Sequence, residues 1–498
     1  RAAGICGISP EFLKCGCEAV LKRLHAVICS AWDTGVIPSD WKRGLVVPLW
    51  KGKGDILDCN NYRGVTLLSV PGKVFARIIR DRILPCLMAG QRPQQSGFTA
   101  KKSTIDRILA LRVLIEQKGE FRQRLHAAYV DLRKAFDSVH RASLWRLLRS
   151  RGIPSKIVNL IAELYSDTSG AVRCGGGISD FFPVNCGVRQ GCVLAPNLFN
   201  TCMDWILGKV SGLDSCGVSL GGVRFTDLDF ADDAVVFAES LDSLVTTLEA
   251  LSRESAALGL QVSWTKTRIQ SFGDSCGESS QALAVGSQSV DFTDQFTYLG
   301  GVVHGSGRSD ADVNRRLGLA TGAMASLTKG VWRCRYLCRR TKVQVFRVLV
   351  LPVLLYGCET WTLTGSLRRR LNSFGTVSLR RILGCRWSDF VSNDQLLRES
   401  GMRYITCIIR ERRLRLFGHV ARFKESDPAH QILFLRNLVE QGRRRGRPQA
   451  SWLRQMDSDC REMSTGLESA RRLAQRRPLE YRQKVDAATR CLGACSHT

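Results

Sequence analysis

Apolar and polar positions along the first 300 residues predict helices and strands in alternation. Residues 125–132 (LHAAYVDL) are typical of a buried strand, and residues 223–230 and 233–240 are typical of two strands that meet at a turn. Helical spacing of apolar residues marks 72–84 and 196–210. The second of these segments begins with a proline, which suits the first turn of a helix.

The same spacing predicts a helix over 133–152 and another over 241–258, each stopped by a glycine. Short strand-like segments follow at 261–264 and 295–303. From about residue 305 the pattern becomes helical and rich in arginine. We therefore expect an α+β core followed by a basic helical region.

The longest apolar run, 345–358, contains Arg347 and Pro352 and is too short to cross a bilayer. We accordingly expect no membrane partner. A chain of 498 residues has room for about two to four domains. Because it begins with Arg1 rather than Met, we expect a fragment of a longer protein, without a signal peptide.

The charge balance narrows the class of partner. Lysine and arginine total 73 against 45 aspartate and glutamate, which leaves +28. Such a charge predicts a polyanionic partner, above all nucleic acid, although an excess of arginine can also serve solubility alone. The 20 cysteines are expected to be reduced thiols of a protein of the nucleus and cytoplasm. Residues 491–495 (CLGAC) with His497 offer only part of a zinc site.

Residues 230–237 (FADDAVVF) place two adjacent carboxylates, Asp232 and Asp233, inside an apolar run. Burying unpaired like charges is costly, so the pair either lies at an exposed turn or shares a cation. Mg²⁺ prefers carboxylate oxygens together with phosphates and water. Such a site needs a third carboxylate from elsewhere in the sheet. Asp131, where the strand 125–132 gives way to a helix, is the best candidate.

Seven segments carry a more specific signal. In chain order they are NYRGVTLLSVPGK (61–73), QQSGFTAKKSTIDRI (94–108), YVDLRKAFDSV (129–139), GVRQGCVLAPNLFN (187–200), FADDAVVF (230–237), GLQVSWTKT (259–267) and FTYLGG (296–301). These segments resemble, in the same order, the motifs of reverse transcriptases, most closely those of LINE-type (non-LTR) retrotransposons. The resemblance extends from about Pro38 to Gly301. Seven ordered motifs are a far stronger signal than any one of them.

The resemblance implies a right-hand polymerase, with fingers, a palm that carries the carboxylates, and a thumb. Asp131 and Asp232 would be the principal ligands of two Mg²⁺ ions, with Mn²⁺ as an alternative. The Leu132 carbonyl would add a backbone oxygen, and Asp233 would complete the acidic cluster. Two such ions activate an attacking hydroxyl and stabilise the leaving pyrophosphate.

The resemblance also implies residues that bind substrate. Phe136 matches an aromatic that lies under the sugar and disfavours a 2′-hydroxyl, although the ring would equally suit a helix core. Gln190 and Gly191 match the motif that lines the nucleotide and template pocket, where a glycine allows close approach of the backbone. Many relatives carry a proline before this glutamine. Here it is Arg189, a difference expected to affect template contacts rather than catalysis.

Basic residues in three motifs imply contacts with the triphosphate. Lys266 matches a lysine near the leaving pyrophosphate, where a cation neutralises developing charge and can supply a proton. Without the order of the motifs, a lone lysine at this position would be interpreted as a solvated surface residue. Arg63 and the pair Lys101–Lys102 fall in the two fingers motifs. The sequence does not decide which of the two lysines contacts the triphosphate. A surface role without any such contact also stays open for either lysine.

The chain is expected to have an N-terminal extension, the fingers and palm, a thumb-like helical region and a basic C-terminal nucleic-acid-binding region, over residues 1–37, 38–304, 305–370 and 371–498. Arginine-rich segments at 368–375, 410–423 and 442–448 are candidates to grip template RNA or target DNA. The alternative is a solvated helical face.

The expected function is that of an RNA-directed DNA polymerase of a LINE-type retrotransposon, which extends a primer 3′-hydroxyl with deoxynucleoside triphosphates (dNTPs). Its partners would be template RNA, primer or target DNA, and dNTPs. One alternative is a maturase-like cellular reverse transcriptase, which would predict a maturase-type region after the thumb. Another is a catalytically silent nucleic-acid-binding relative, which fits the charge but leaves the acidic triad without a purpose.

Overall fold

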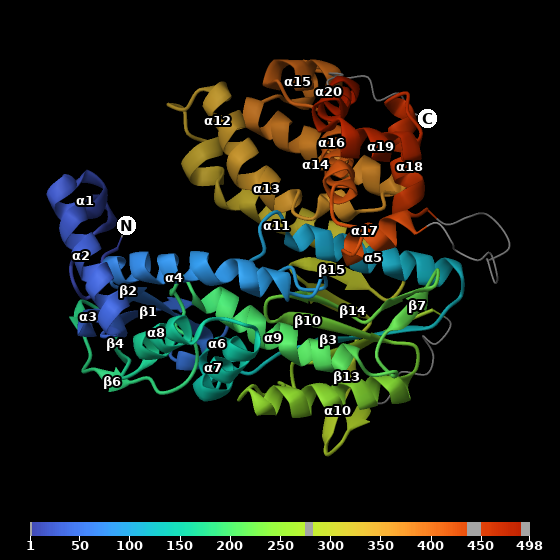
Figure 1. The fold of residues 1–498 in the computed structure, drawn as a ribbon. Helices are drawn as coiled ribbons and strands as arrows, with labels where there is room; N and C mark the ends of the chain where they lie inside the picture. Colours follow the sequence, from blue (N-terminus) through green and yellow to red (C-terminus); the bar gives the residue numbers. More distant parts are fainter. Residues whose placement is uncertain (1, 274–281, 436–449, 490–498) are drawn as a thin grey trace.

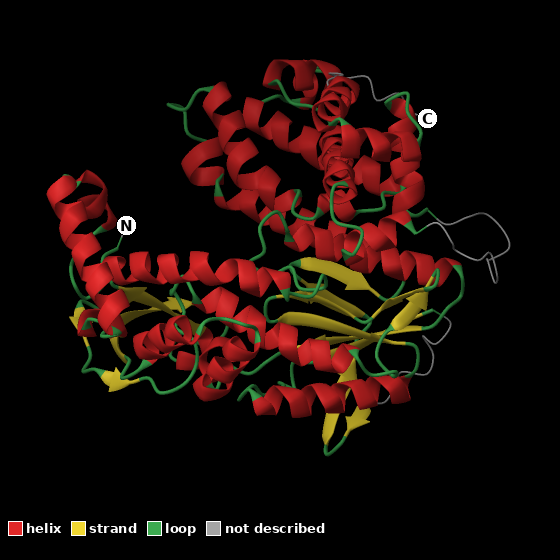
Figure 2. Ribbon diagram, viewed as in Figure 1, coloured by secondary structure: helices red, strands yellow, loops and turns green. Residues whose placement is uncertain are grey.

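The computed structural model describes residues 2–273, 282–435 and 450–489. Strands and helices alternate as far as His304, and the described residues beyond it are helical (Figure 2). The predicted α+β class is confirmed. In Figure 1 the helical C-terminal half, gold to red, lies on top of a lower layer that contains the sheets.

The larger sheet has six strands in the order β12-β13-β11-β3-β10-β9. Their bounds are β3 Leu125–Val130, β9 Asp227–Phe230, β10 Asp233–Ala238, β11 Arg268–Phe272, β12 Leu283–Val285 and β13 Gln288–Phe292. All of β3 is buried, and it pairs antiparallel with both β10 and β11. The mainly apolar residues 125–130 therefore form a central strand that is covered on both faces.

Each face of this sheet packs against a different set of helices. Ala128 and Val130 belong to a core shared with α4, α9 and α10, whereas Ala127 and Tyr129 belong to a core shared with α5 and the C-terminal helices. This alternation follows from the two-residue period of a strand. The helices of the first 260 residues are α1 Pro10–Cys15, α2 Glu18–Thr34, α3 Ser39–Lys42, α4 Val70–Ala89, α5 Thr104–Glu120, α6 Ala135–Ser138, α7 Arg141–Ser150, α8 Ser155–Tyr165, α9 Ala195–Ser211 and α10 Leu241–Ala257.

A second sheet has the order β2-β1-β4-β5, with β6 also paired to β4. Its strands are β1 Arg43–Trp50, β2 Tyr62–Leu68, β4 Ser169–Cys174, β5 Gly177–Ile178 and β6 Phe182–Pro183. Two further hairpins are formed by β7 Val218–Leu220 with β8 Val223–Phe225, and by β14 Gln295–Tyr298 with β15 Gly301–His304. The second of these hairpins confirms the strand character predicted for 295–303.

The helices predicted over 72–84, 196–210 and 241–258 are confirmed as α4, α9 and α10. The single helix predicted over 133–152 is wrong, because the chain breaks between α6 and α7 at Val139 and His140. At the break the backbone bonds elsewhere, since Gly187 N donates to the Val139 carbonyl and His140 N donates to the Leu258 carbonyl. Tertiary hydrogen bonds thus override the helical spacing.

Two strand predictions also need correction. Residues 261–264 form no strand, and Val262 makes only an isolated bridge with Leu132. Residues 223–230 are divided into β8 and β9 rather than one strand. The Thr226 carbonyl between them accepts a hydrogen bond from Phe237 N, and the two halves pair with different partners.

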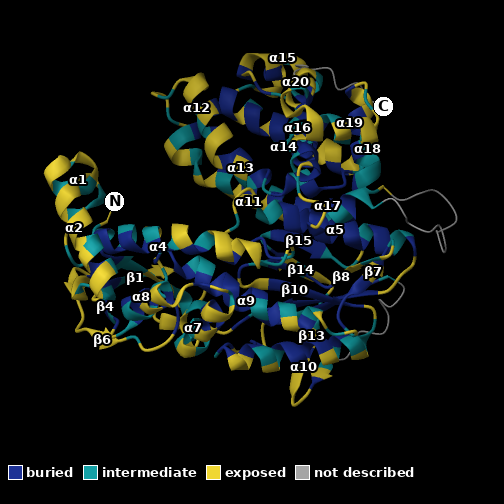
Figure 3. Cartoon of the chain, viewed as in Figure 1, coloured by how far each residue is buried: buried dark blue, intermediate teal, exposed yellow. Residues whose placement is uncertain are grey.

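The C-terminal helices are α11 Asp310–Ser326, α12 Arg339–Val345, α13 Leu351–Leu354, α14 Gly365–Leu383, α15 Asn393–Ser400, α16 Ile405–Ala421, α17 Pro428–Phe434, α18 Trp452–Glu462, α19 Leu467–Arg476 and α20 Pro478–Thr489. Within the apolar run 345–358, residues 345–354 are divided between α12, a π-helical turn and α13, and residues 355–358 lead into a short 3-10 helix. None of the helices in the described ranges is long and apolar enough to cross a membrane. Burial is continuous from the larger sheet through α5 into α16 and α17 (Figure 3).

Candidate active site

The larger sheet brings Asp131 next to Asp233. The last pair of β3 with β10 joins Val130 to Ala234, so the next position of each strand places Asp131 opposite Asp233. On the other side of β3, the last pair with β11 joins Tyr129 to Arg268. Two positions further, Lys266 stands beside Asp131, with Nζ 3.4 Å from Oδ2.

Asp232 lies in the two-residue turn that connects β9 to β10, where Phe230 pairs with Asp233. The other turn residue, Ala231, has φ +60°, in the left-handed region that non-glycine residues rarely adopt. Both residues are partly exposed to solvent, although neighbouring groups remove part of the water around their carboxylates. The prediction of two strands that meet at an acidic turn is therefore confirmed, and the turn lies beside the end of β3.

The electrostatics of the turn reflect these neighbours. Loss of hydration raises the pKa of Asp233 to about 6, and the charges of Asp232 and Asp131 add to this effect. Loss of hydration also raises the pKa of Asp232, again with a contribution from Asp131. The Arg63 guanidinium opposes both increases in pKa. Arg63, which lies on β2, is thereby close enough to act on the two carboxylates.

The residues present suit a hard divalent cation. Oδ2 of Asp131 is buried and accepts no hydrogen bond from the described residues, and its charged neighbour is the Lys266 ammonium described above. A carboxylate oxygen without a hydrogen bond is a suitable ligand for such a cation. Leu132 follows directly and is buried. Across the described ranges, no group of three or more His, Cys, Asp or Glu side chains is arranged so that it could hold a metal ion by itself. An ion bound by one or two of these carboxylates would therefore need substrate phosphates and water as its further ligands.

The residues matched to the nucleotide pocket lie together beside β2. Gln190 accepts a hydrogen bond from Thr66 N at its carbonyl, and Phe136 accepts one from Val188 N. A Cβ on Gly191, which has φ +104°, would lie 2.4 Å from the Thr66 carbonyl oxygen. The glycine is thus required for close approach to β2, whereas the sequence suggested approach to a substrate. The half-buried Phe136 ring stacks on Phe199, with centroids 4.5 Å apart.

The adjacent lysines of the second fingers motif differ in their surroundings. Lys101 is exposed, with φ +65°. Lys102 pairs with Asp427, from the C-terminal region, and its Nζ lies 3.3 Å from the centre of the Phe423 ring. Burial lowers the pKa of Lys102, and Asp427 opposes that effect. The ammonium of Lys102 is therefore occupied within the chain.

One residue at the acidic turn was not among the candidates. Gln95 is buried, and its Oε1 accepts hydrogen bonds from Ala231 N at 3.1 Å and from Gly97 N at 2.8 Å. It belongs to the motif QQSGFTAKKSTIDRI, but the motif match says nothing of a contact with the turn. The only sequence signal is a polar residue between apolar segments, which is too common to be selective.

Other candidate features lie apart from the carboxylates. Arg189 donates to the Trp41 carbonyl and stacks over the Tyr165 ring. The zinc candidate at 491–497 and the basic segment 442–448 lie outside the described residues.

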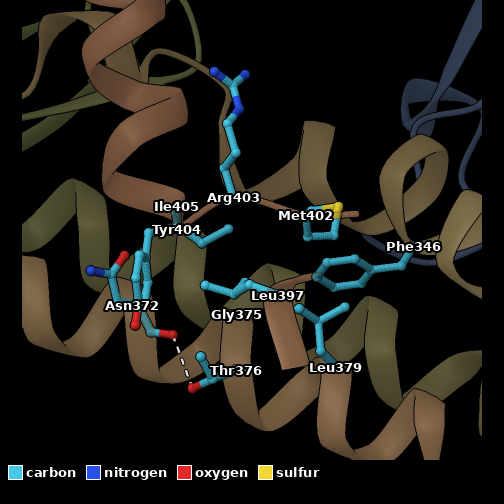
Figure 4. Close-up of a pocket in the computed structure, with 10 residues that line it drawn as sticks. All are labelled: Phe346, Asn372, Gly375, Thr376, Leu379, Leu397, Met402, Arg403, Tyr404 and Ile405. Atoms are coloured by element: carbon cyan, nitrogen blue, oxygen red, sulfur yellow. Dashed lines mark hydrogen bonds between the residues drawn. The ribbon is translucent and has the colours of Figure 1, made fainter. Parts of the chain in front are cut away.

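Figure 4 shows a hollow within the C-terminal helices. The volume of this hollow that a water molecule can occupy is about 10 Å³, enough for about one molecule. It is therefore a packing defect rather than a substrate site. It is lined by Phe346, Asn372, Gly375, Thr376, Leu379, Leu397, Met402, Arg403, Tyr404 and Ile405.

The chain is similar in sequence to a known protein family and to several known proteins. Residues 51–303 match the family model described as reverse transcriptase (RNA-dependent DNA polymerase). The Pol polyprotein of a type-1 retrotransposable element R2 from Popillia japonica is 27% identical over 360 residues, 70% of this chain and 48% of that protein. The RNA-directed DNA polymerase from mobile element jockey of Drosophila melanogaster is 22% identical over 385 residues, 74% of this chain and 41% of that protein.

A further relative is the transposon TX1 149 kDa protein of Xenopus laevis, 25% identical over 293 residues, 59% of this chain and 21% of that protein. The chain spans less than half of the length of each of these three relatives. Among solved structures, Candida tropicalis telomerase with a fragment of telomeric RNA aligns with 95% of this chain and 68% of its own, at 11% identity and a TM-score of 0.42.

Proposed function

The chain belongs to the reverse transcriptase (RNA-dependent DNA polymerase) family, of the non-LTR retrotransposon type, and on that premise we propose that it extends a primer 3′-hydroxyl with dNTPs on an RNA template. The observation that carries the proposal is the convergence of Asp131, the Asp232–Asp233 turn and Lys266 at neighbouring strand ends. A polymerase needs carboxylates and a cation at one point, and a purely structural sheet does not.

Asp131 and Asp232 would hold two Mg²⁺ ions, with the Leu132 carbonyl and Asp233 completing the set and Mn²⁺ as an alternative. When bound, such ions activate the attacking hydroxyl and stabilise the leaving pyrophosphate. The raised pKa of Asp233 supports this role, because a carboxylate that is costly to ionise alone gains most from a cation.

The remaining residues would bind and orient the nucleotide. Lys266 would neutralise charge at the pyrophosphate and supply a proton to it. Arg63 and Lys101 would contact the triphosphate, and Lys101 is preferred over Lys102 because Asp427 already pairs with Lys102. Phe136 would lie under the sugar, and the Gln190–Gly191 segment would border the nucleotide and template.

Nucleic acid would contact the exposed arginines of α14 rather than those of α16. Arg368, Arg369 and Arg370 are exposed. Arginines 412, 413 and 415 on α16 instead pair with carboxylates of the chain. Trp387, in the loop after α14, is 88% exposed and offers a surface on which a base could stack.

The four expected regions remain our proposed division, namely the N-terminal extension at 1–37, fingers and palm at 38–304, the thumb-like region at 305–370 and the basic region at 371–498. The helical character of the described residues after His304 supports a boundary near that point. The shared core of α5 with α16 and α17 argues that the last region packs on the palm rather than standing apart.

The test is primer extension on an RNA template with Mg²⁺. We expect DNA synthesis by the parent chain, almost none by Asp232→Ala, and the parental rate for Asp180→Ala, which removes an exposed carboxylate outside the turn. Equal synthesis by the parent and Asp232→Ala would reject the site. A folded parent that binds RNA but makes no DNA would favour a catalytically silent nucleic-acid-binding protein.

A further inference from the structure

The acidic turn is held by a segment that precedes α5. Asp229 N donates to the Gln94 carbonyl at 3.2 Å, and Ser96 N donates to the Asp229 carbonyl at 3.0 Å. Gln95 accepts from Ala231 N, as described above. Residues 94–97 therefore run along β9 and fix the backbone of the turn that carries the carboxylates.

The contact at the turn is too close for any side chain on Gly97. A Cβ there would lie 2.2 Å from Ala231 N. Asn200 on α9 donates to the Gly97 carbonyl. Because Ala231 is held at φ +60°, a conformation that is unfavourable for a non-glycine residue, its neighbours must supply the restraint. Gln95 accepts a hydrogen bond from Ala231 N, and Gly97 lies close against the same residue.

The segment 94–97 is in turn held by Arg107. This arginine is fully buried on α5, where Nε donates to Ser96 Oγ and Nη2 donates to the Pro93 carbonyl at 2.9 Å. A buried guanidinium requires a counter-charge close by. Asp427 provides one, since its Oδ2 lies 3.5 Å from Nη2 of Arg107 and also pairs with Lys102.

Asp427 belongs to the C-terminal region, more than 190 residues after the turn in sequence. It is 4% exposed, and its other oxygen, Oδ1, accepts from Ala429 N at 2.9 Å at the start of α17. A continuous set of contacts thus leads from α17 through Asp427, Arg107 and residues 94–97 to Ala231. The region that the sequence assigned only to nucleic-acid binding reaches the acidic turn.

We propose that Asp427 is a positioning residue, through which the C-terminal helices hold the Ala231–Asp232 turn in the geometry required for nucleotide addition. The inference rests on the proposed polymerase function. Loss of the carboxylate charge leaves Arg107 and Lys102 without this counter-ion, so residues 94–97 loosen and the carboxylates move. A displacement of about 1 Å at a reacting centre can cost about 100-fold in rate.

The test compares Asp427→Asn with Asp459→Asn in the full chain. The asparagine keeps the size of Asp427 and an oxygen for Ala429 N, but removes the charge. Asp459 is a matched control, because it is buried and its ion pairs within the described residues are with Arg410 and Arg413 of α16 rather than with Arg107. Asp427→Glu tests rescue, since it restores the charge.

We expect Asp427→Asn to lower kcat for single-nucleotide addition by about 10- to 100-fold, with KM for the dNTP and Kd for the primer–template within about twofold of the parent values. Asp427→Glu should recover much of kcat, and Asp459→Asn should keep it. Equal loss in Asp427→Asn and Asp459→Asn, or weaker primer–template binding with kcat unchanged, would overturn the proposal.

A second measurement does not depend on activity. Amide hydrogen exchange in the peptide that contains Ala231 should be about tenfold faster in Asp427→Asn and unchanged in Asp459→Asn. Unchanged exchange in Asp427→Asn would overturn the proposal. If the parent makes no DNA, the proposed function fails, whereas the exchange result still decides whether Asp427 holds the turn.

Discussion

Lys266 places its ammonium 3.4 Å from Oδ2 of Asp131, although the two residues are far apart in sequence. The distance follows from strand register, because β11 lies beside β3 and its preceding turn carries the lysine to the end of β3. Lys266 N donates to the Ser263 carbonyl, and Ser263 N donates to the Asp131 carbonyl. The backbone of the lysine turn is therefore tied directly to Asp131.

This contact predicts the effect of removing the lysine. On the role proposed for Lys266, Lys266→Ala should slow nucleotide addition by about 100-fold or more, because it removes both the positive charge and the proposed proton donor. Lys266→Arg should be intermediate, since arginine keeps the charge but does not release a proton. Single-turnover extension measures both. Lys14→Ala, at an exposed lysine near the N-terminus, serves as control. A parental rate for Lys266→Ala would contradict the assigned role.

The raised pKa of Asp233 predicts a pH-dependent cost to stability. The value rises from 3.8 to about 6 in the folded chain, so between these pH values the folded chain binds more protons than the unfolded chain does. The contribution of Asp233 to the free energy of unfolding therefore falls as the pH rises through this window, and it stays low above it. Asp233→Asn should accordingly raise that free energy at about pH 8 and leave it nearly unchanged at about pH 3.5.

Urea unfolding at the two pH values measures the effect of Asp233→Asn, with Asp180→Asn as a control at an exposed carboxylate. An equal gain at both pH values would show that the asparagine acts through something other than the titration of Asp233. The same variant should lose primer extension. A substitution that stabilises the chain while it abolishes activity is the behaviour expected of a group kept for chemistry.

The exposed arginines of α14 predict a salt effect. Replacing Arg369 and Arg370 by alanine should weaken RNA binding at every sequence tested and reduce the slope of log K against log salt concentration by about one to two. Fluorescence anisotropy over a salt series gives the slope. Arg461→Ala, which removes an arginine already paired with Asp457, should leave the slope unchanged. Parental slopes in the double variant would place the nucleic acid elsewhere.

Much of the acidic site could be predicted from the sequence, because strand ends and turns leave local signals. Asp131 follows a buried apolar strand, and Asp232 and Asp233 interrupt another. The family match confirms the reverse transcriptase family expected from the ordered motifs. The particular roles of Lys266, Phe136 and the other matched residues stay predictions.

The rest depended on long-range contacts that no local pattern encodes. The helix predicted over 133–152 breaks because its carbonyl at Val139 and amide at His140 bond to distant segments. The pairing of Lys102 with Asp427 joins residues that no motif connects. Gln95 is a third long-range case, because its side-chain oxygen accepts a hydrogen bond from Ala231 N, which no local pattern predicts.

Phe136 gives a prediction that separates selectivity from packing. Its ring stacks on Phe199 and is half-buried, so Phe136→Ala should cost about 1–3 kcal/mol of stability whatever its function. If the ring also lies under the sugar, the same change should lower the preference for dNTPs over ribonucleotides by about tenfold or more.

The control for Phe136→Ala is Phe199→Leu, which removes the stacking partner but keeps apolar volume. This control should affect stability alone. Relative rates of single dNTP and ribonucleotide addition measure the preference. Loss of stability in Phe136→Ala with parental selectivity would assign the ring to the helix core, because a steric role cannot survive removal of the ring.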